Sequence, residues 1–146
     1  GPAIEAAGRA CGLPTLKPNE AMFEQALAAG AGPGGAPVRL GLVATFEASL
    51  PSMSEELQAM AAQRGIAIAL HAVLVPEAMD DLARGNAADH HRKIAEAARA
   101  LSGCDAVMLA QFSMAAAQPA TQAGLDCPVL SSPDCAVLAL RQTMAA

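Results

Sequence analysis

The sequence predicts an α/β protein, a three-layer α/β/α sandwich built on a mainly parallel sheet. Two observations support this prediction. Four short segments are almost wholly apolar, which is typical of strands that are buried on both faces of a parallel sheet. The stretches between them carry apolar residues three or four positions apart, as amphipathic helices do. The expected strands are residues 38–45, 66–75, 105–110 and 127–130.

The segments around these strands are expected to be helical. The clearest case follows the first strand, where Leu50, Met53, Leu57 and Met60 lie on one helical face and Gly65 ends the pattern. Gly12 has the same role after the first helix of the chain. The expected helices are residues 3–10, 18–29, 49–64, 76–84, 87–101, 114–123 and 133–143, with a short extended piece at 13–16.

Residues 30–37 are rich in glycine and proline, and they divide the chain into two parts. The glycines can be written as G-x-G-x-x-G, the fingerprint of a dinucleotide-binding loop. In that fold they follow a strand and open a helix, whereas here they follow a helix and precede a strand. We therefore interpret the segment as a linker. Residues 1–37 are then the tail of an incomplete N-terminal half plus this linker, and residues 38–146 form the α/β domain.

Composition narrows the class of partner. The 146 residues carry a formal net charge of −5, no Trp or Tyr and three Phe, so basic patches and aromatic platforms for nucleic acid are lacking. No apolar run reaches the roughly 18 residues of a membrane span. The cysteines lack zinc-type spacing. We expect a reduced, cytoplasmic protein that binds neither nucleic acid nor a membrane.

Polar residues follow the first and third strands, at the sheet edge where parallel α/β proteins bind ligands. Thr45 ends the first strand and Ser49 begins the next helix. Their hydroxyls and the free amides of the helix form a natural cradle for a carboxylate, although Ser49 serves equally well as a simple N-cap. Gln111, Phe112 and Ser113 follow the third strand, and we expect them to face a substrate.

The fourth strand is followed by Cys135, which lies near the start of a helix. A thiol in that position can have its pKa lowered, as a nucleophile requires, but Asp134 beside it opposes such a shift. Cys135 is therefore either a reactive thiol or a packed small residue. Cys104 and Cys127 come before strands, at the opposite edge of the sheet, and are expected to be structural.

The histidines give weaker signals. Asp89-His90-His91 suggests a metal ligand set, yet adjacent helical side chains point about 100° apart and do not easily share one ion. We expect this segment to be a solvated helix start and expect no metal. His71 lies inside the second strand, where it is expected to be a core histidine with its hydrogen bonds satisfied.

Together the strand-end segments resemble the aspartate/glutamate racemase superfamily, which includes glutamate, aspartate and hydantoin racemases, maleate isomerase and arylmalonate decarboxylase. This resemblance implies two similar α/β halves with the active site in the cleft between them. It also implies proton transfer between two cysteines without any cofactor, with Thr45 and Ser49 in the cradle for the substrate carboxylate. The matching segments are Leu13-Pro14-Thr15-Leu16 with Asn19-Glu20-Ala21, Leu42-Val43-Ala44-Thr45-Phe46 with Ser49, Asp105-Ala106-Val107-Met108-Leu109-Ala110, and Cys127-Pro128-Val129-Leu130-Ser131-Ser132-Pro133.

The chain departs from this family pattern in two ways. Gln111 stands where the second-half cysteine is expected, and an amide is neither an acid nor a base near neutral pH. Most of the first half, with its cysteine, is also expected to be missing, so that the chain corresponds to the second half plus a tail of the first. Two-cysteine racemisation by this chain is therefore not expected.

The resemblance then implies a protein that acts on, or binds, a small carboxylate or hydantoin-type metabolite. A single-base reaction such as decarboxylation or isomerisation suits the site. Gln111 and Ser113 would donate hydrogen bonds to a developing oxyanion, and Phe46 and Phe112 would form an apolar wall. The alternative is a non-catalytic ligand-binding or interaction domain. A missing N-terminal half is further expected to leave an apolar patch near residues 3–27 that favours a homo-oligomer.

Overall fold

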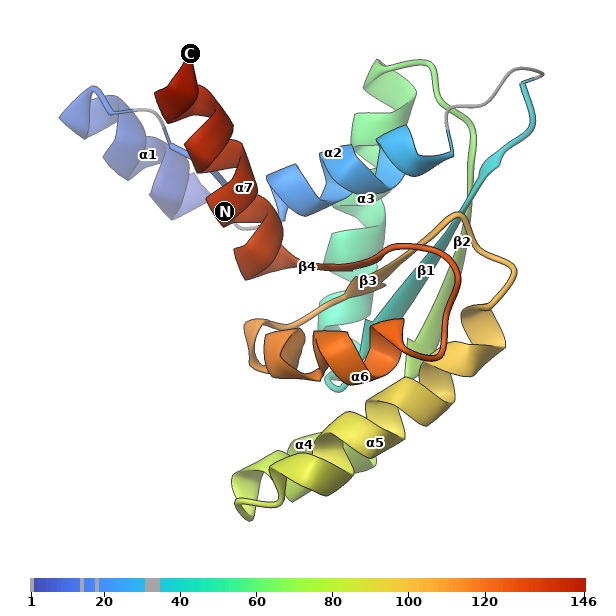
Figure 1. The fold of residues 1–146 in the computed structure, drawn as a ribbon. Coiled ribbons are helices and arrows are strands. Elements are labelled where there is room, and N and C mark those ends of the chain that lie inside the picture. The colour runs from blue at the N-terminus through green and yellow to red at the C-terminus, as the bar shows by residue number, and fades with distance from the viewer. Residues whose placement is uncertain (1, 14, 18, 31–34) are drawn as a thin grey trace.

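The structure is a computed structural model that describes residues 2–13, 15–17, 19–30 and 35–146 (Figure 1). Its centre is a sheet in which all of the described strands run parallel, in the order β2-β1-β3-β4. The α/β class and the parallel sheet predicted from the apolar runs are therefore confirmed. The strands are β1 (Val38–Ala44), β2 (Ile68–Leu74), β3 (Ala106–Leu109) and β4 (Val129–Ser131).

Helices connect and cover these strands. The α-helices in the described residues are α1 (Pro2–Cys11), α2 (Glu20–Ala29), α3 (Leu50–Gln63), α4 (Pro76–Ala83), α5 (Ala87–Ala98), α6 (Gln118–Gln122) and α7 (Ser132–Ala145). Short 3-10 turns are η1 (Glu47–Ser49), η2 (Arg99–Leu101) and η3 (Phe112–Ala117).

The elements lie close to their expected positions, with two differences. The helix expected at 114–123 is a 3-10 turn, η3, followed by α6, because Pro119 favours the first turn of a new helix. The described residues of the piece at 13–16 adopt no strand. Position 18, where a helix was expected to begin, and positions 31–34 of the linker lie outside the described residues.

The sheet carries a separate apolar core on each face, which makes the fold three-layered. Successive strand side chains point to opposite faces. Leu40 and Met108 pack with α2, α3 and the start of α7, whereas Val43 and Val107 pack with α4, α5 and η3. Figure 1 shows α2 and α3 on one side of the sheet and α5 with α6 on the other.

The strand order creates one place where the connections diverge. The chain leaves β1 through α3, on one face of the sheet, and leaves β3 through η3 and α6, on the opposite face. Because β1 and β3 are neighbours, a topological switch point lies between their carboxyl ends. In open α/β sheets, ligands bind in the crevice at such a point.

Apolar side chains remain exposed on the outermost helices. The patch expected near residues 3–27 is present only in its first part, since Ile4 and Leu13 are exposed whereas Met22, Phe23 and Leu27 of α2 are buried against the sheet. The largest exposed group lies on α7 instead, and consists of Val137, Leu138, Leu140 and Met144. No helix in the described part of the chain is long and apolar enough to cross a membrane.

Candidate functional site

Three polar side chains meet at the switch point between β1 and β3. The Oε1 atom of Gln111 accepts hydrogen bonds from the backbone N–H of Thr45 at 2.9 Å and from its hydroxyl at 3.2 Å. The Nε2 atom of Gln111 donates to Ser49 Oγ at 2.7 Å. The Ser49 hydroxyl in turn donates to the carbonyl of Phe46 at 2.7 Å. We call Thr45, Ser49 and Gln111 the amide cluster.

The sheet register explains why these residues meet. Val43 pairs with Leu109 in the parallel ladder between β1 and β3. Two residues further along each strand, the same register places Thr45 opposite Gln111. The turn η1 then folds Ser49 back toward them. The amide cluster is therefore a continuation of the two central strands.

The geometry contradicts one of the two expectations for Ser49, the simple N-cap. Its side chain makes no capping hydrogen bond to the helix that follows. It instead orients the amide of Gln111, which had been expected to act near the substrate. Both lone pairs of Gln111 Oε1 are used, so one N–H of Nε2 remains for a ligand.

A hollow of about 580 Å³ adjoins the amide cluster between the ends of β1 and β2 and the start of α4. Thr45, which is 3% exposed, belongs to both the cluster and the hollow. Phe46 gives it an aromatic wall and is 52% exposed. The lining residues are Thr45, Phe46, Glu47, Ala48, Leu74, Pro76, Met79 and Asp80.

Of the eight residues that line this hollow, sequence reasoning had pointed only to Thr45 and Phe46. Leu74, Pro76, Met79 and Asp80 belong to the end of β2 and the start of α4. The signal was available, because the second apolar run ends in Val-Pro-Glu at the same sheet edge as the other strand ends. Only the polar character of the other three strand ends drew attention to them.

Two predicted site residues lie apart from the amide cluster. Phe112 is 58% exposed, and neither it nor Ser113 lines the hollow. Ser113 is exposed, and its hydroxyl forms no hydrogen bond with the described residues. Both lie in the η3 turn directly after Gln111, so they flank the site without contributing to its observed contacts.

The side chains at the end of β4 are buried or bonded to one another. Ser131 is buried, and its hydroxyl donates to Asp134 Oδ2 at 2.5 Å. Cys135 is 3% exposed and packs in the core beneath α2 and α3. Burial raises the pKa of the Cys135 thiol, and the nearby Asp134 carboxylate raises it further. These properties match the packed small residue rather than the reactive thiol.

The other cysteines beside strands lie away from this edge. Cys104 and Cys127 precede β3 and β4 and pack with the core on the α5 face. Burial is the main cause that raises the pKa of both thiols. These surroundings indicate a structural role for both thiols.

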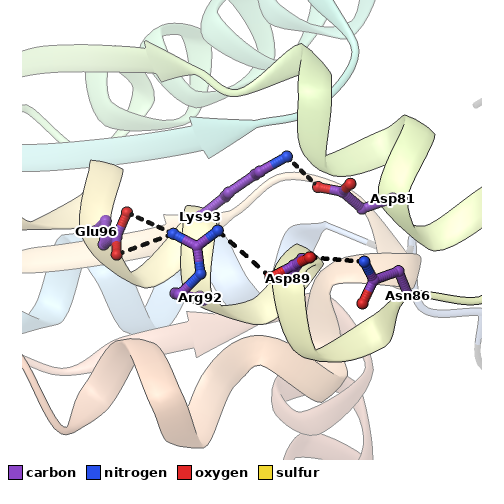
Figure 2. Close-up of polar contacts among 6 residues, drawn as sticks. All are labelled: Asp81, Asn86, Asp89, Arg92, Lys93 and Glu96. Carbon is purple, nitrogen blue, oxygen red and sulfur yellow. Dashed lines mark hydrogen bonds and ion pairs between the residues drawn. The ribbon is translucent and has the colours of Figure 1, made fainter.

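The Asp89-His90-His91 segment differs from the expected solvated helix start. Asp89 accepts from Asn86 Nδ2 at 2.6 Å and pairs with Arg92 (Figure 2). His90, in contrast, is 1% exposed and lies in the interior. Among the described residues, no group of three or more His, Cys, Asp or Glu side chains is placed to hold a metal ion.

His71 also differs from its expectation. It was expected to be a core residue, yet its side chain is exposed. The reason is the strand order, because β2 lies at the edge of the sheet and is incompletely covered.

The fold and the site together define the class of protein. It is a doubly wound parallel α/β protein with hydroxyl and amide groups gathered at the switch point of its sheet. A comparison with models of protein families matches residues 1–140 to the family described as Asp/Glu/Hydantoin racemase. The chain belongs to this family. No curated protein and no solved structure matches it.

Proposed function

We propose that the chain binds a small carboxylate or hydantoin-type metabolite at the amide cluster, and that in the intact protein this binding supports cofactor-independent proton transfer or decarboxylation. The observation that carries the proposal is the position of Thr45, Ser49 and Gln111 at the switch point. Two donors fix the amide of Gln111 through its oxygen, so its remaining N–H is oriented before a ligand arrives. Preorganised donors of this kind stabilise a developing oxyanion.

One observation favours binding without catalysis as the second candidate function. The amide cluster contains two hydroxyls and an amide, none of which is an acid or base near neutral pH. Cys135, the thiol that follows the end of β4 at this edge of the sheet, is buried and its pKa is raised. A proton-transferring group would have to come from elsewhere, and a binding domain needs none.

The binding step is tested by titrating the chain with propanoate, malonate and hydantoin, using calorimetry or amide chemical shifts. Hydrogen bonds to charged groups are worth about 1.5–3 kcal/mol. Gln111→Ala should therefore weaken carboxylate binding about tenfold or more, and Thr45→Val should act in the same direction. Gln58→Ala, an exposed glutamine of α3, is the matched control and should change nothing. Equal affinities of Gln111→Ala and the unmodified chain would exclude the amide cluster as the binding site.

Catalysis is tested separately, in heavy water. A proton-transfer enzyme incorporates deuterium at the α-carbon of a bound carboxylate, and a decarboxylase releases carbon dioxide. Either signal that is lost in Gln111→Ala supports the enzymatic proposal. Saturable binding without either signal supports the binding domain.

A further inference from the structure

A second hollow, of about 490 Å³, opens over the edge strand β2. It shares no residue with the hollow beside Thr45. Arg39 of β1, His71 of β2 and Gly103, which follows η2, lie around it. The ionisable side chains in its lining are those of Arg39, His71 and Cys104, and no acidic residue lines it.

Two glycines shape this hollow by allowing close contacts. A Cβ atom on Gly41 would lie 2.8 Å from Leu101 Cδ1, so only glycine lets Leu101 pack directly on the sheet there. A Cβ atom on Gly103 would lie 2.9 Å from Arg39 Nη2. The guanidinium of Arg39 therefore lies over Gly103, beside the other residues that line the hollow.

The charge of Arg39 is left without a counter-ion. Its guanidinium forms no ion pair or hydrogen bond with the described residues. Asp105 contacts only its backbone, because Asp105 Oδ2 accepts from the Arg39 N–H at 2.8 Å. The register pairs Arg39 with Ala69 and Gly41 with His71. His71 therefore lies two residues beyond the partner of Arg39, and the two side chains are on the same face of the sheet.

We propose that this hollow binds the phosphate or sulfate group of a small organic ester. The planar guanidinium of Arg39 donates two parallel hydrogen bonds to such an oxyanion. The imidazole of His71 supplies a further N–H donor in either protonation state. The hollow is larger than one oxyanion, and the apolar side chains of Leu101 and Val73 line the space left for the organic part.

The test follows amide chemical shifts of the chain at constant ionic strength, with sodium sulfate and phenyl phosphate as probes. Both should give saturable shifts around Arg39, His71 and Gly103, with tighter binding of phenyl phosphate. Arg39→Gln should weaken both probes about tenfold or more. Arg141→Gln, an exposed arginine of α7, is its control and should bind like the unmodified chain.

A second pair of variants tests the position of the guanidinium rather than its presence. Gly103→Ala adds a methyl group where Arg39 Nη2 lies, so it should displace the guanidinium and weaken binding while the fold is kept. Gly124→Ala is the control, since its nearest neighbour, Arg99 Nε, would lie at an ordinary 3.7 Å.

Three outcomes would overturn the proposal: no saturable shift, equal binding by Arg39→Gln, or equal loss in the control variants. Sulfate binding as tight as phenyl phosphate would overturn the organic ester as ligand. Gln111→Ala should leave this binding intact, so a failure here is distinct from a failure of the proposed function.

Discussion

Replacing His90 by leucine should stabilise the protein, and the gain should grow as the pH falls. The imidazole is 1% exposed, and neither ring nitrogen has a hydrogen-bond partner in the described structure. The carboxylate that faces it from α4 belongs to Asp81, which is already paired with Lys93 at 2.5 Å (Figure 2). His91, on the same helix, lies edge-on to it with ring centroids 5.1 Å apart.

The magnitude follows from two effects. A buried polar group without a partner costs about 1–3 kcal/mol, which leucine avoids at every pH. Burial is the main cause that lowers the pKa of His90; the charge of His91 lowers it further and that of Asp81 raises it. The neighbouring elements η3 and α6 contain no titratable residue. The unfolded chain therefore binds the proton first, and stability falls as the pH drops below about 6.5, by at most about 1.4 kcal/mol per pH unit.

Urea unfolding at pH 7.5 and pH 5.5 measures both effects. We expect His90→Leu to raise the free energy of unfolding at pH 7.5 and to exceed the unmodified chain by a wider margin at pH 5.5. His71→Gln is the exposed control and retains the pH dependence caused by His90. A margin that stays constant between the two pH values, or a variant less stable at both, would refute the reasoning.

The same structure leads to one prediction on thiol reactivity and one on a substitution. Cys135 should react with iodoacetamide far more slowly than the exposed Cys11, because burial raises the pKa of the Cys135 thiol. Mass spectrometry of the alkylated chain measures both rates, and equal rates would contradict the place of Cys135 in the core. Gly41→Ala should lower the free energy of unfolding by about 1–3 kcal/mol through overpacking against Leu101, and an unchanged unfolding midpoint in urea would contradict that contact.

The fold was predictable because its signals are local. Continuous apolar runs and intervening helical spacing were enough to place the four strands within a few residues. The boundaries around Phe112 were less predictable. A 3-10 turn and an α-helix share their apolar spacing over one or two turns, so the sequence pattern could not separate η3 from α6.

The candidate site was predictable only in part, because it depends on which strands are neighbours. Thr45 and Gln111 could each be placed at a strand end, but their contact requires β1 to lie beside β3. The burial of His90 was also predictable from the spacing of residues on α5, but the adjacent Asp89 and His91 suggested a solvated segment. His90, Ile94 and Ala98 recur every four residues on α5 and share its buried face.

Under the proposed function, the placement of the amide cluster determines which part of the site can change between ligands. The backbones of Thr45 and Gln111 continue the paired central strands, so the register of the sheet sets the distance between them. The opposite wall of the hollow belongs to α4, a surface helix that carries the exposed Met79. Under the proposed function, changes of ligand size would be absorbed by α4, whereas the position of the Gln111 amide is set by the register of the two central strands.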